Sequence, residues 1–192
     1  MTGAARDPLP LMFSVHPGRE VVRQGELYPD AWVVRSGAFL MEAVDEEGRR
    51  LVLDVLGPGD LVGGPATWTA DASVRALVPG ELFAAGSVSI RDGLARRARR
   101  GAALACAIAW HPVSDRVVFA LEDLVLRFGR PARDGRRIAL PITQEHLAAM
   151  TGATRESVNR ALMSLVAQGR VCRDRRRYVI PSGSTSWARR PA

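Results

Sequence analysis

The chain has 192 residues, 47% of them hydrophobic, and a formal net charge of +7. A chain of this length can form one sizeable domain and a smaller one, and no run of apolar residues is long enough to predict a membrane helix. Two cysteines cannot build a disulfide framework or a four-ligand metal site, so we expect no cofactor and a cytoplasmic location.

The charge is distributed unevenly along the chain. Residues 1–84 carry a net charge of −5, whereas residues 130–192 carry a net charge of +9, and every basic residue is arginine. Arginine remains protonated and binds phosphate or guanine through paired hydrogen bonds. This asymmetry favours a polyanion as the partner of the C-terminal part, although charge alone is equally compatible with a solvated arginine-rich tail.

Residues 18 to 84 are predicted to form β structure. Short runs rich in valine, leucine and tryptophan alternate with glycines, and residues 45–48 have the composition of a hairpin turn. Strands with turns at this spacing are typical of a small barrel or roll. Residues 1–84 are therefore assigned to an N-terminal β-roll.

Residues 85–110 are assigned to one long helix. Apolar or small residues at heptad spacing form a narrow seam between arginines, and these residues are Leu94, Ala98, Gly101, Ala105 and Ile108. Such a seam favours pairing with a second copy of the helix, so we predict a homodimer. The alternative is that the helix packs on its own β-roll. Cys106, beside the seam, is expected to be a small buried residue, and the alternative is a disulfide with its copy across a two-fold axis.

The remainder, residues 111–182, is predicted to be a winged helix-turn-helix domain. A helix is expected to begin at Pro112 and to run to about residue 128. Residues 129–137 are expected to form a loop rich in glycine, proline and arginine. The whole chain is thus predicted to have an α+β fold, with a basic tail at residues 183–192.

Two short helices separated by a tight turn are expected within this domain. Thr143 is placed to cap the first helix, and Thr154 is placed to cap the second. The turn contains Gly152, and the small residue Ala148 leaves room where the helices cross. Residues 171–180 then resemble a hairpin, the wing, in which Cys172 is expected to pack.

The second short helix begins with side chains suited to reading DNA bases, namely Arg155, Glu156, Asn159 and Arg160. Arginine can bind O6 and N7 of guanine, and glutamate can accept a hydrogen bond from N4 of cytosine. Because phosphate repels a carboxylate, Glu156 is more easily explained as a base-reading residue. The alternative is an ordinary exposed surface of arginine and glutamate.

Residues 142–152 and 154–160 together resemble the DNA-binding signature of the Crp/Fnr transcription regulators. Residues 57–61 resemble part of that family's β-roll, and Pro112 falls where the family has its hinge. The resemblance implies a regulator rather than an enzyme, and no Gly-rich nucleotide loop or nucleophile elbow contradicts this. It also implies activation of transcription, with RNA polymerase as a partner.

The resemblance also assigns roles to individual residues. Arg155, Glu156 and Arg160 match the three base-reading positions of the cyclic-AMP receptor branch, which implies a palindromic site with TGTGA-like half-sites. Positions that contact phosphate in the family are occupied here by Thr143, Thr154 and Ser157. The wing arginines, Arg175, Arg176 and Arg177, are expected to add further phosphate contacts.

The sensor residues depart from the cyclic-AMP branch. Relatives that bind cyclic AMP carry a Gly-Glu pair and an Arg-Ser pair, whereas this chain has Gly63-Gly64 and Ala70-Asp71. An aspartate facing a cyclic phosphate would repel it. We therefore expect a regulator that acts without cyclic AMP. The alternative is a regulator whose β-roll senses another small molecule or a redox signal, and the sequence does not identify an effector.

Overall fold

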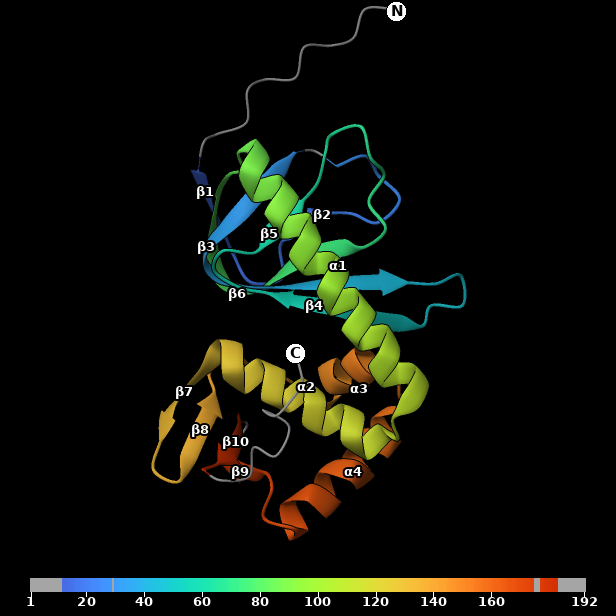
Figure 1. The fold of residues 1–192 in the computed structure, drawn as a ribbon, viewed down its shortest axis with the longest axis vertical. Coiled ribbons are helices and arrows are strands. Elements are labelled where there is room, and N and C mark those ends of the chain that lie inside the picture. The colour runs from blue at the N-terminus through green and yellow to red at the C-terminus, as the bar shows by residue number, and fades with distance from the viewer. Residues whose placement is uncertain (1–11, 29, 175–176, 183–192) are drawn as a thin grey trace, which may run out of the picture.

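The computed structural model describes residues 12–28, 30–174 and 177–182, and Figure 1 shows a β-roll joined by one long helix to a smaller helical domain. The strands and helices are β1 (Met12–Val15), β2 (Glu20–Val22), β3 (Ala31–Val44), β4 (Arg50–Leu56), β5 (Leu61–Gly63), β6 (Ser73–Ala84), α1 (Ser87–Trp110), α2 (Val113–Phe128), β7 (Gly129–Ala132), β8 (Gly135–Ile138), α3 (Gln144–Thr151), α4 (Arg155–Ala167), β9 (Cys172–Asp174) and β10 (Arg177–Pro181). The predicted α+β fold is confirmed.

The β-roll is antiparallel and is organised around the long strands β3 and β6. The strand order is β1-β6-β3-β4, with β2 also paired to β6 and β5 to β3. Phe39, Leu82 and Val62 are fully buried between the strands. The hairpin turn predicted at residues 45–48 is confirmed, since the Gly48 amide donates to the Asp45 carbonyl. The strands begin earlier than predicted, at Met12.

Helix α1 lies against the β-roll and extends from it to the helical domain (Figure 1). Gly93 is buried, and a Cβ added there would lie 2.5 Å from the Leu61 side chain, so only glycine lets the helix approach β5 this closely. Arg97 donates hydrogen bonds of 3.0 Å to the carbonyls of Leu61 and Gly63. Strand β5 is thereby fixed to α1 at both of its ends.

The helical domain contains a four-stranded antiparallel sheet in the order β7-β8-β10-β9. Pro112 is the N-cap residue of α2, directly before its first helical residue. The prediction of a loop at residues 129–137 is wrong, because β7 and β8 form a hairpin there. The hairpin is extended by pairing of β8 with β10, more than forty residues away in the chain, and such long-range pairing leaves no local pattern in the sequence.

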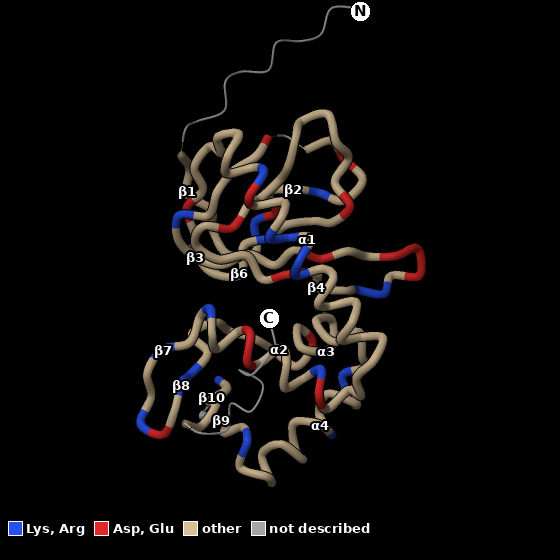
Figure 2. Tube along the Cα trace, viewed as in Figure 1, with Lys and Arg blue, Asp and Glu red and all other residues tan. Residues whose placement is uncertain are grey.

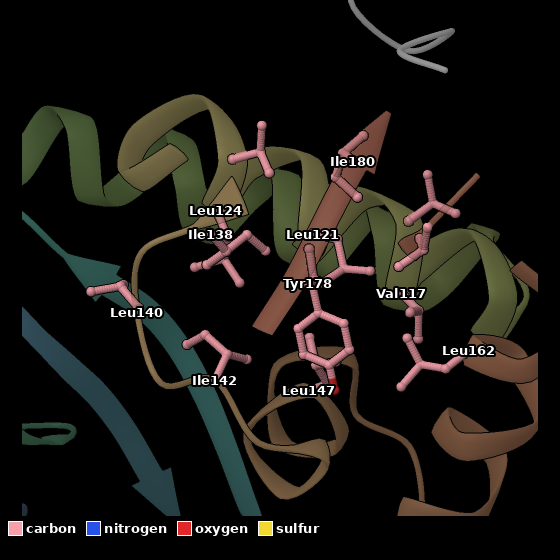
Figure 3. Close-up of a cluster of buried hydrophobic side chains, with 14 of the residues drawn as sticks. Val117, Leu121, Leu124, Ile138, Leu140, Ile142, Leu147, Leu162, Tyr178 and Ile180 are labelled. Carbon is pink, nitrogen blue, oxygen red and sulfur yellow. The ribbon is translucent and has the colours of Figure 1, made fainter. Parts of the chain in front are cut away.

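The core of the helical domain continues into the β-roll. Figure 3 shows side chains from α2, α3, α4 and β10 converging on one apolar cluster, with Leu140 and Ile142 on the connection that precedes α3. Leu40, Val52 and Val55 of the β-roll are buried in the same cluster. The helical domain is therefore packed directly on the sheet rather than suspended from α1.

An interdomain ion cluster reinforces this packing. Arg127 of α2 donates to Asp54 and Asp60 of the β-roll, each at 2.9 Å, and Arg100 of α1 donates to the same two carboxylates at 2.7 Å. Burial alone would raise the pKa of Asp60, but hydrogen bonding from Arg100 and from the Gly57 amide lowers it below its ordinary value. The cluster joins three parts of the chain through pairs of opposite charges.

Candidate nucleic-acid interface

Helices α3 and α4 form the predicted helix-turn-helix. Thr143 caps α3, and Gly152 ends it in the left-handed conformation with φ 58° and ψ 39°, where a side chain would be strained. Thr154 then caps α4 by accepting a hydrogen bond from the Ser157 amide at 3.2 Å. Val158, fully buried on the inner side of α4, leaves the opposite side of that helix facing solvent. The predicted caps and turn are confirmed.

The first two turns of α4 expose four polar side chains, those of Arg155, Glu156, Asn159 and Arg160. Within the described ranges, the side chains of Arg155 and Glu156 make neither a hydrogen bond nor an ion pair. A side chain at the start of such a helix, with its donors or acceptors free, is available for base edges in a major groove. The structure thus brings the four predicted base-reading residues together on one exposed surface.

Sequence reasoning missed Gln144, which orients one of these residues. The Gln144 side-chain amide, at the start of α3, donates to the side-chain oxygen Oδ1 of Asn159 at 3.0 Å. This bond spans the helix-turn-helix and holds Asn159 beside Arg155. A polar residue directly after the first N-cap was the only signal in the sequence.

The three predicted phosphate-contacting hydroxyls lie at the starts of the two helices. Thr143 and Thr154 are exposed, and Ser157 is half-buried. Ser157 also accepts hydrogen bonds from Thr154 at 3.0 Å and from Arg160 at 3.3 Å. Free backbone amides and the positive end of the helix dipole make such helix starts favourable for phosphate.

His146 completes a reciprocal cap at the start of α3. Its amide donates to the Thr143 hydroxyl at 3.1 Å, and its Nδ1 accepts from the Thr143 amide at 3.3 Å. Burial is the main cause that lowers the pKa of His146, and the nearby charge of Arg50 lowers it further. Both effects keep the imidazole neutral, which Nδ1 requires in order to accept a hydrogen bond.

The predicted wing is the hairpin of β9 and β10. Arg175 and Arg176 lie outside the described residues. Arg177 is half-buried and donates to the Ala139 carbonyl, so part of its guanidinium is already engaged inside the domain. The expectation that Cys172 packs is wrong, since it lies exposed on the edge strand β9.

A second basic hairpin, β7 and β8, went unrecognised in the sequence because it was interpreted as a loop. It contains Arg130, Arg133, Arg136 and Arg137. Figure 2 shows basic residues along this hairpin and acidic residues at the distant β3–β4 turn. The charge asymmetry of the sequence is therefore also a spatial asymmetry of the molecule.

The β-roll positions compared above with the cyclic-AMP branch are Gly64, Ala70 and Asp71. A Cβ added to Gly64 would lie 2.9 Å from the ring of Tyr28, which is buried. Ala70 is buried as well, and its amide and carbonyl bond to Glu26 and Gly25. Asp71 is exposed. Tyr28 therefore fills the space next to the position where the family pattern has a glutamate.

The predicted dimer seam is only partly free on α1. Ala98, Gly101 and Ala105 are exposed, whereas Leu94 and Ile108 are half-buried against the same protomer. Further exposed small residues continue the heptad spacing on this side of the helix, at Ala95, Ala102 and Ala109. Cys106 is a half-buried free thiol.

The described part of the chain holds neither a metal-binding cluster nor a membrane-spanning helix. No three or more histidine, cysteine or acidic side chains in the described ranges are grouped closely enough to hold a metal ion. Across those same ranges, no helix combines the length and the apolar character needed to cross a membrane.

Two family models match this chain. The Crp-like helix-turn-helix domain matches residues 115–182, and the cyclic nucleotide-binding domain matches residues 12–97. The CRP-like cAMP-activated global transcriptional regulator of Mycobacterium tuberculosis is 30% identical over 190 aligned residues, which cover 90% of this chain and 84% of that protein. The nitrogen fixation regulation protein FixK of Rhizobium meliloti is 28% identical, covering 81% of this chain and 75% of FixK.

Solved structures share the same fold. A CRP/FNR-family transcriptional regulator from Thermus thermophilus superimposes with a TM-score of 0.77 at 22% identity, covering 88% of this chain and 92% of that one. FixK2 of Bradyrhizobium japonicum gives a TM-score of 0.75 at 20% identity, with 88% and 91% covered. The matched domains and the relative from M. tuberculosis together show that this chain belongs to the Crp/Fnr family of DNA-binding transcription regulators, which are not enzymes.

Proposed function

We propose that this regulator binds a palindromic DNA site with TGTGA-like half-sites and that it does so without cyclic AMP. One observation carries the base-reading part of the proposal. Arg155 and Glu156 stand exposed at the start of α4, without partners among the described residues, at positions that match the family's base-reading residues. Arg160 and Asn159 extend the same surface, and the capping hydroxyls with the wing arginines contact phosphate.

The bound form is a homodimer joined through α1. A palindromic site requires two reading helices related by a two-fold axis, about 34 Å apart along the DNA. The exposed alanines of α1 lie opposite the side that packs on the β-roll, where Gly93 and Ala107 are buried. Small side chains allow two such helices to approach closely. A monomeric mass in solution with DNA binding intact would contradict this part.

Independence from cyclic AMP is supported by the β-roll. Binding the cyclic phosphate needs a cation, but the matching position is Ala70, followed by Asp71. The position that matches the family's ribose-binding glutamate is Gly64, and the Tyr28 ring lies beside it. The relative from M. tuberculosis is named as a cAMP-activated regulator. The same effector is expected for this chain only if the residues that hold it are present. In this chain those residues are replaced.

A DNA-binding titration tests the proposal. Fluorescence anisotropy would be followed for a labelled duplex with two TGTGA half-sites, with and without cyclic AMP, and for a duplex with both half-sites scrambled. We expect tight binding of the palindrome without additives, unchanged by cyclic AMP. Binding only in the presence of cyclic AMP would contradict the proposal, and equal binding of both duplexes would contradict base reading. We further propose that the regulator activates transcription, as the family resemblance implies, and run-off transcription with RNA polymerase should then yield more transcript when the protein is added.

A further inference from the structure

A cavity of about 440 Å³ lies where the β-roll, α1 and the helical domain meet. Its walls come from β4, α1, α2 and the end of α3 and are mainly apolar, including Leu53, Leu104, Ile108, Phe119, Leu126 and Met150. Small-molecule sites typically have volumes of roughly 300–1,000 Å³, apolar walls and a few polar groups. The cavity has these properties, and it is separate from the β-roll positions around Gly64.

The acidic side chains in the cavity wall already interact with other residues of the chain. Asp54 is paired with Arg100 and Arg127, and Asp123 accepts from Arg127 at 3.1 Å. Glu122 also has an interaction within the chain. The carboxylates of the cavity are thus engaged by the protein itself.

Arg116 is a half-buried cation of the cavity wall whose charge has no acidic partner among the described residues. It is half-buried, its Nε donates to the His111 carbonyl at 2.7 Å, and its terminal nitrogen donates to the Thr151 carbonyl at 3.1 Å. Within the described part of the chain, no carboxylate pairs with Arg116. Buried charges are normally paired, and two carbonyls occupy only two of the five N–H donors of a guanidinium. An anionic group fits here.

We propose that the cavity binds a small organic carboxylate with a hydrocarbon body. The carboxylate pairs with the remaining donors of Arg116, and the hydrocarbon body covers Leu104, Ile108 and Phe119. A cyclic nucleotide fits poorly, because its ribose and base would leave many polar groups unsatisfied against apolar walls. The exposed alanines of α1, including Ala102 and Ala105, lie on the side of the helix away from the cavity, whereas Ile108 of the predicted dimer seam belongs to the cavity wall.

The position of the cavity gives such a ligand a structural consequence. Its walls belong to both the β-roll and the DNA-binding domain, so a bound molecule touches both at once. A ligand stabilises the arrangement to which it binds more tightly. The bound carboxylate therefore favours the docked arrangement of the two domains over any arrangement in which they separate.

Calorimetry on the full chain tests the site, with octanoate as the probe and octan-1-ol and octylamine as matched ligands. We expect one octanoate per protomer, and at least tenfold weaker binding of the alcohol and the amine. Arg116→Gln removes the charge and should weaken octanoate binding at least tenfold. Ala103→Leu adds apolar volume to the cavity wall and should weaken it at least as much. Arg19→Ala, an exposed arginine on the β-roll, is the matched control and should bind octanoate like the wild type.

Two results would overturn the proposal. One is octanoate binding with equal affinity to the wild type and to Ala103→Leu, and the other is octylamine binding as tightly as octanoate. If Arg116→Gln fails to fold, Ala103→Leu still decides the outcome, because it removes no hydrogen bond. Binding is measured without DNA, so failure here leaves the proposed DNA recognition unaffected.

Discussion

Helix α4 and the β-roll differ in how closely their residues follow the pattern of the cyclic-AMP receptor branch. On α4, Arg155 and Glu156 match the family pattern and remain exposed without partners among the described residues. In the β-roll, the positions compared with the ligand-holding residues of the cyclic-AMP branch are Gly64 and Ala70, and the Tyr28 ring lies beside Gly64. The proposed function therefore implies that one fold keeps its DNA-reading surface without the ligand-holding residues of its β-roll.

The two regions are nevertheless mechanically joined. Leu40 and Val52 of the sheet are buried in the same cluster as the helices of the DNA-binding domain, and Arg127 forms ion pairs with Asp54 and Asp60 across the junction. Substitutions can probe the junction and each of the two regions separately.

The largest effect is expected from Arg127→Met, which breaks the junction. Asp54 and Asp60 would keep Arg100 as their one cationic partner among the described residues, and removing one member of a buried ion cluster costs about 3 kcal/mol or more. Urea denaturation should show this loss in the free energy of unfolding. Arg133→Met, at an exposed position in the β7–β8 turn, should change it by less than about 0.5 kcal/mol. Equal effects of the two variants would mean that the cluster contributes nothing.

Gly64→Ala examines the filled space in the β-roll. The added methyl group meets the Tyr28 ring, and overpacking of this kind costs roughly 1–3 kcal/mol. A double-mutant cycle with Tyr28→Ala isolates the clash, since the penalty should disappear when the ring is absent. A penalty of the same size in both backgrounds would place the clash elsewhere.

Thr154→Ala examines the start of the reading helix. Loss of an N-cap hydroxyl costs about 1 kcal/mol, and Thr154→Ser keeps the hydroxyl and should recover most of it. Thermal unfolding measures both variants. The idea fails if serine and alanine destabilise the protein to the same extent.

The smallest effect concerns His146 and pH. Burial and the charge of Arg50 lower its pKa in the folded chain, so the unfolded chain takes up the proton first as the pH falls. Stability should therefore decline as the pH drops below about 6.5, the ordinary value for histidine. His146→Gln retains a capping acceptor and should lose this part of the pH dependence. An unchanged profile between pH 7.5 and 5.5 would exclude the role.

Local signals explain what the sequence predicted well. Thr143, Gly152 and Thr154 act within one or two helical turns, so their roles follow from residue type and spacing. Interactions between distant segments were missed: the β7–β8 hairpin depends on β10, and Arg127 meets Asp60 from 67 residues away. The ring of Tyr28 beside Gly64 is a contact of the same kind. Such contacts depend on the packing of whole elements, which composition and periodicity do not encode.

Selection of bound sites from random DNA, at fixed salt, is the decisive test of base reading by α4. The wild type should return a palindrome with TGTGA-like half-sites. Arg155→Ala should weaken binding to that site and lose preference at one position per half-site, because a bidentate base contact is worth about 1–3 kcal/mol of discrimination. Glu156→Ala should lose specificity while non-specific affinity holds or rises, since a negative charge near phosphate is removed. If all three proteins return the same motif, neither residue reads bases and the account is wrong.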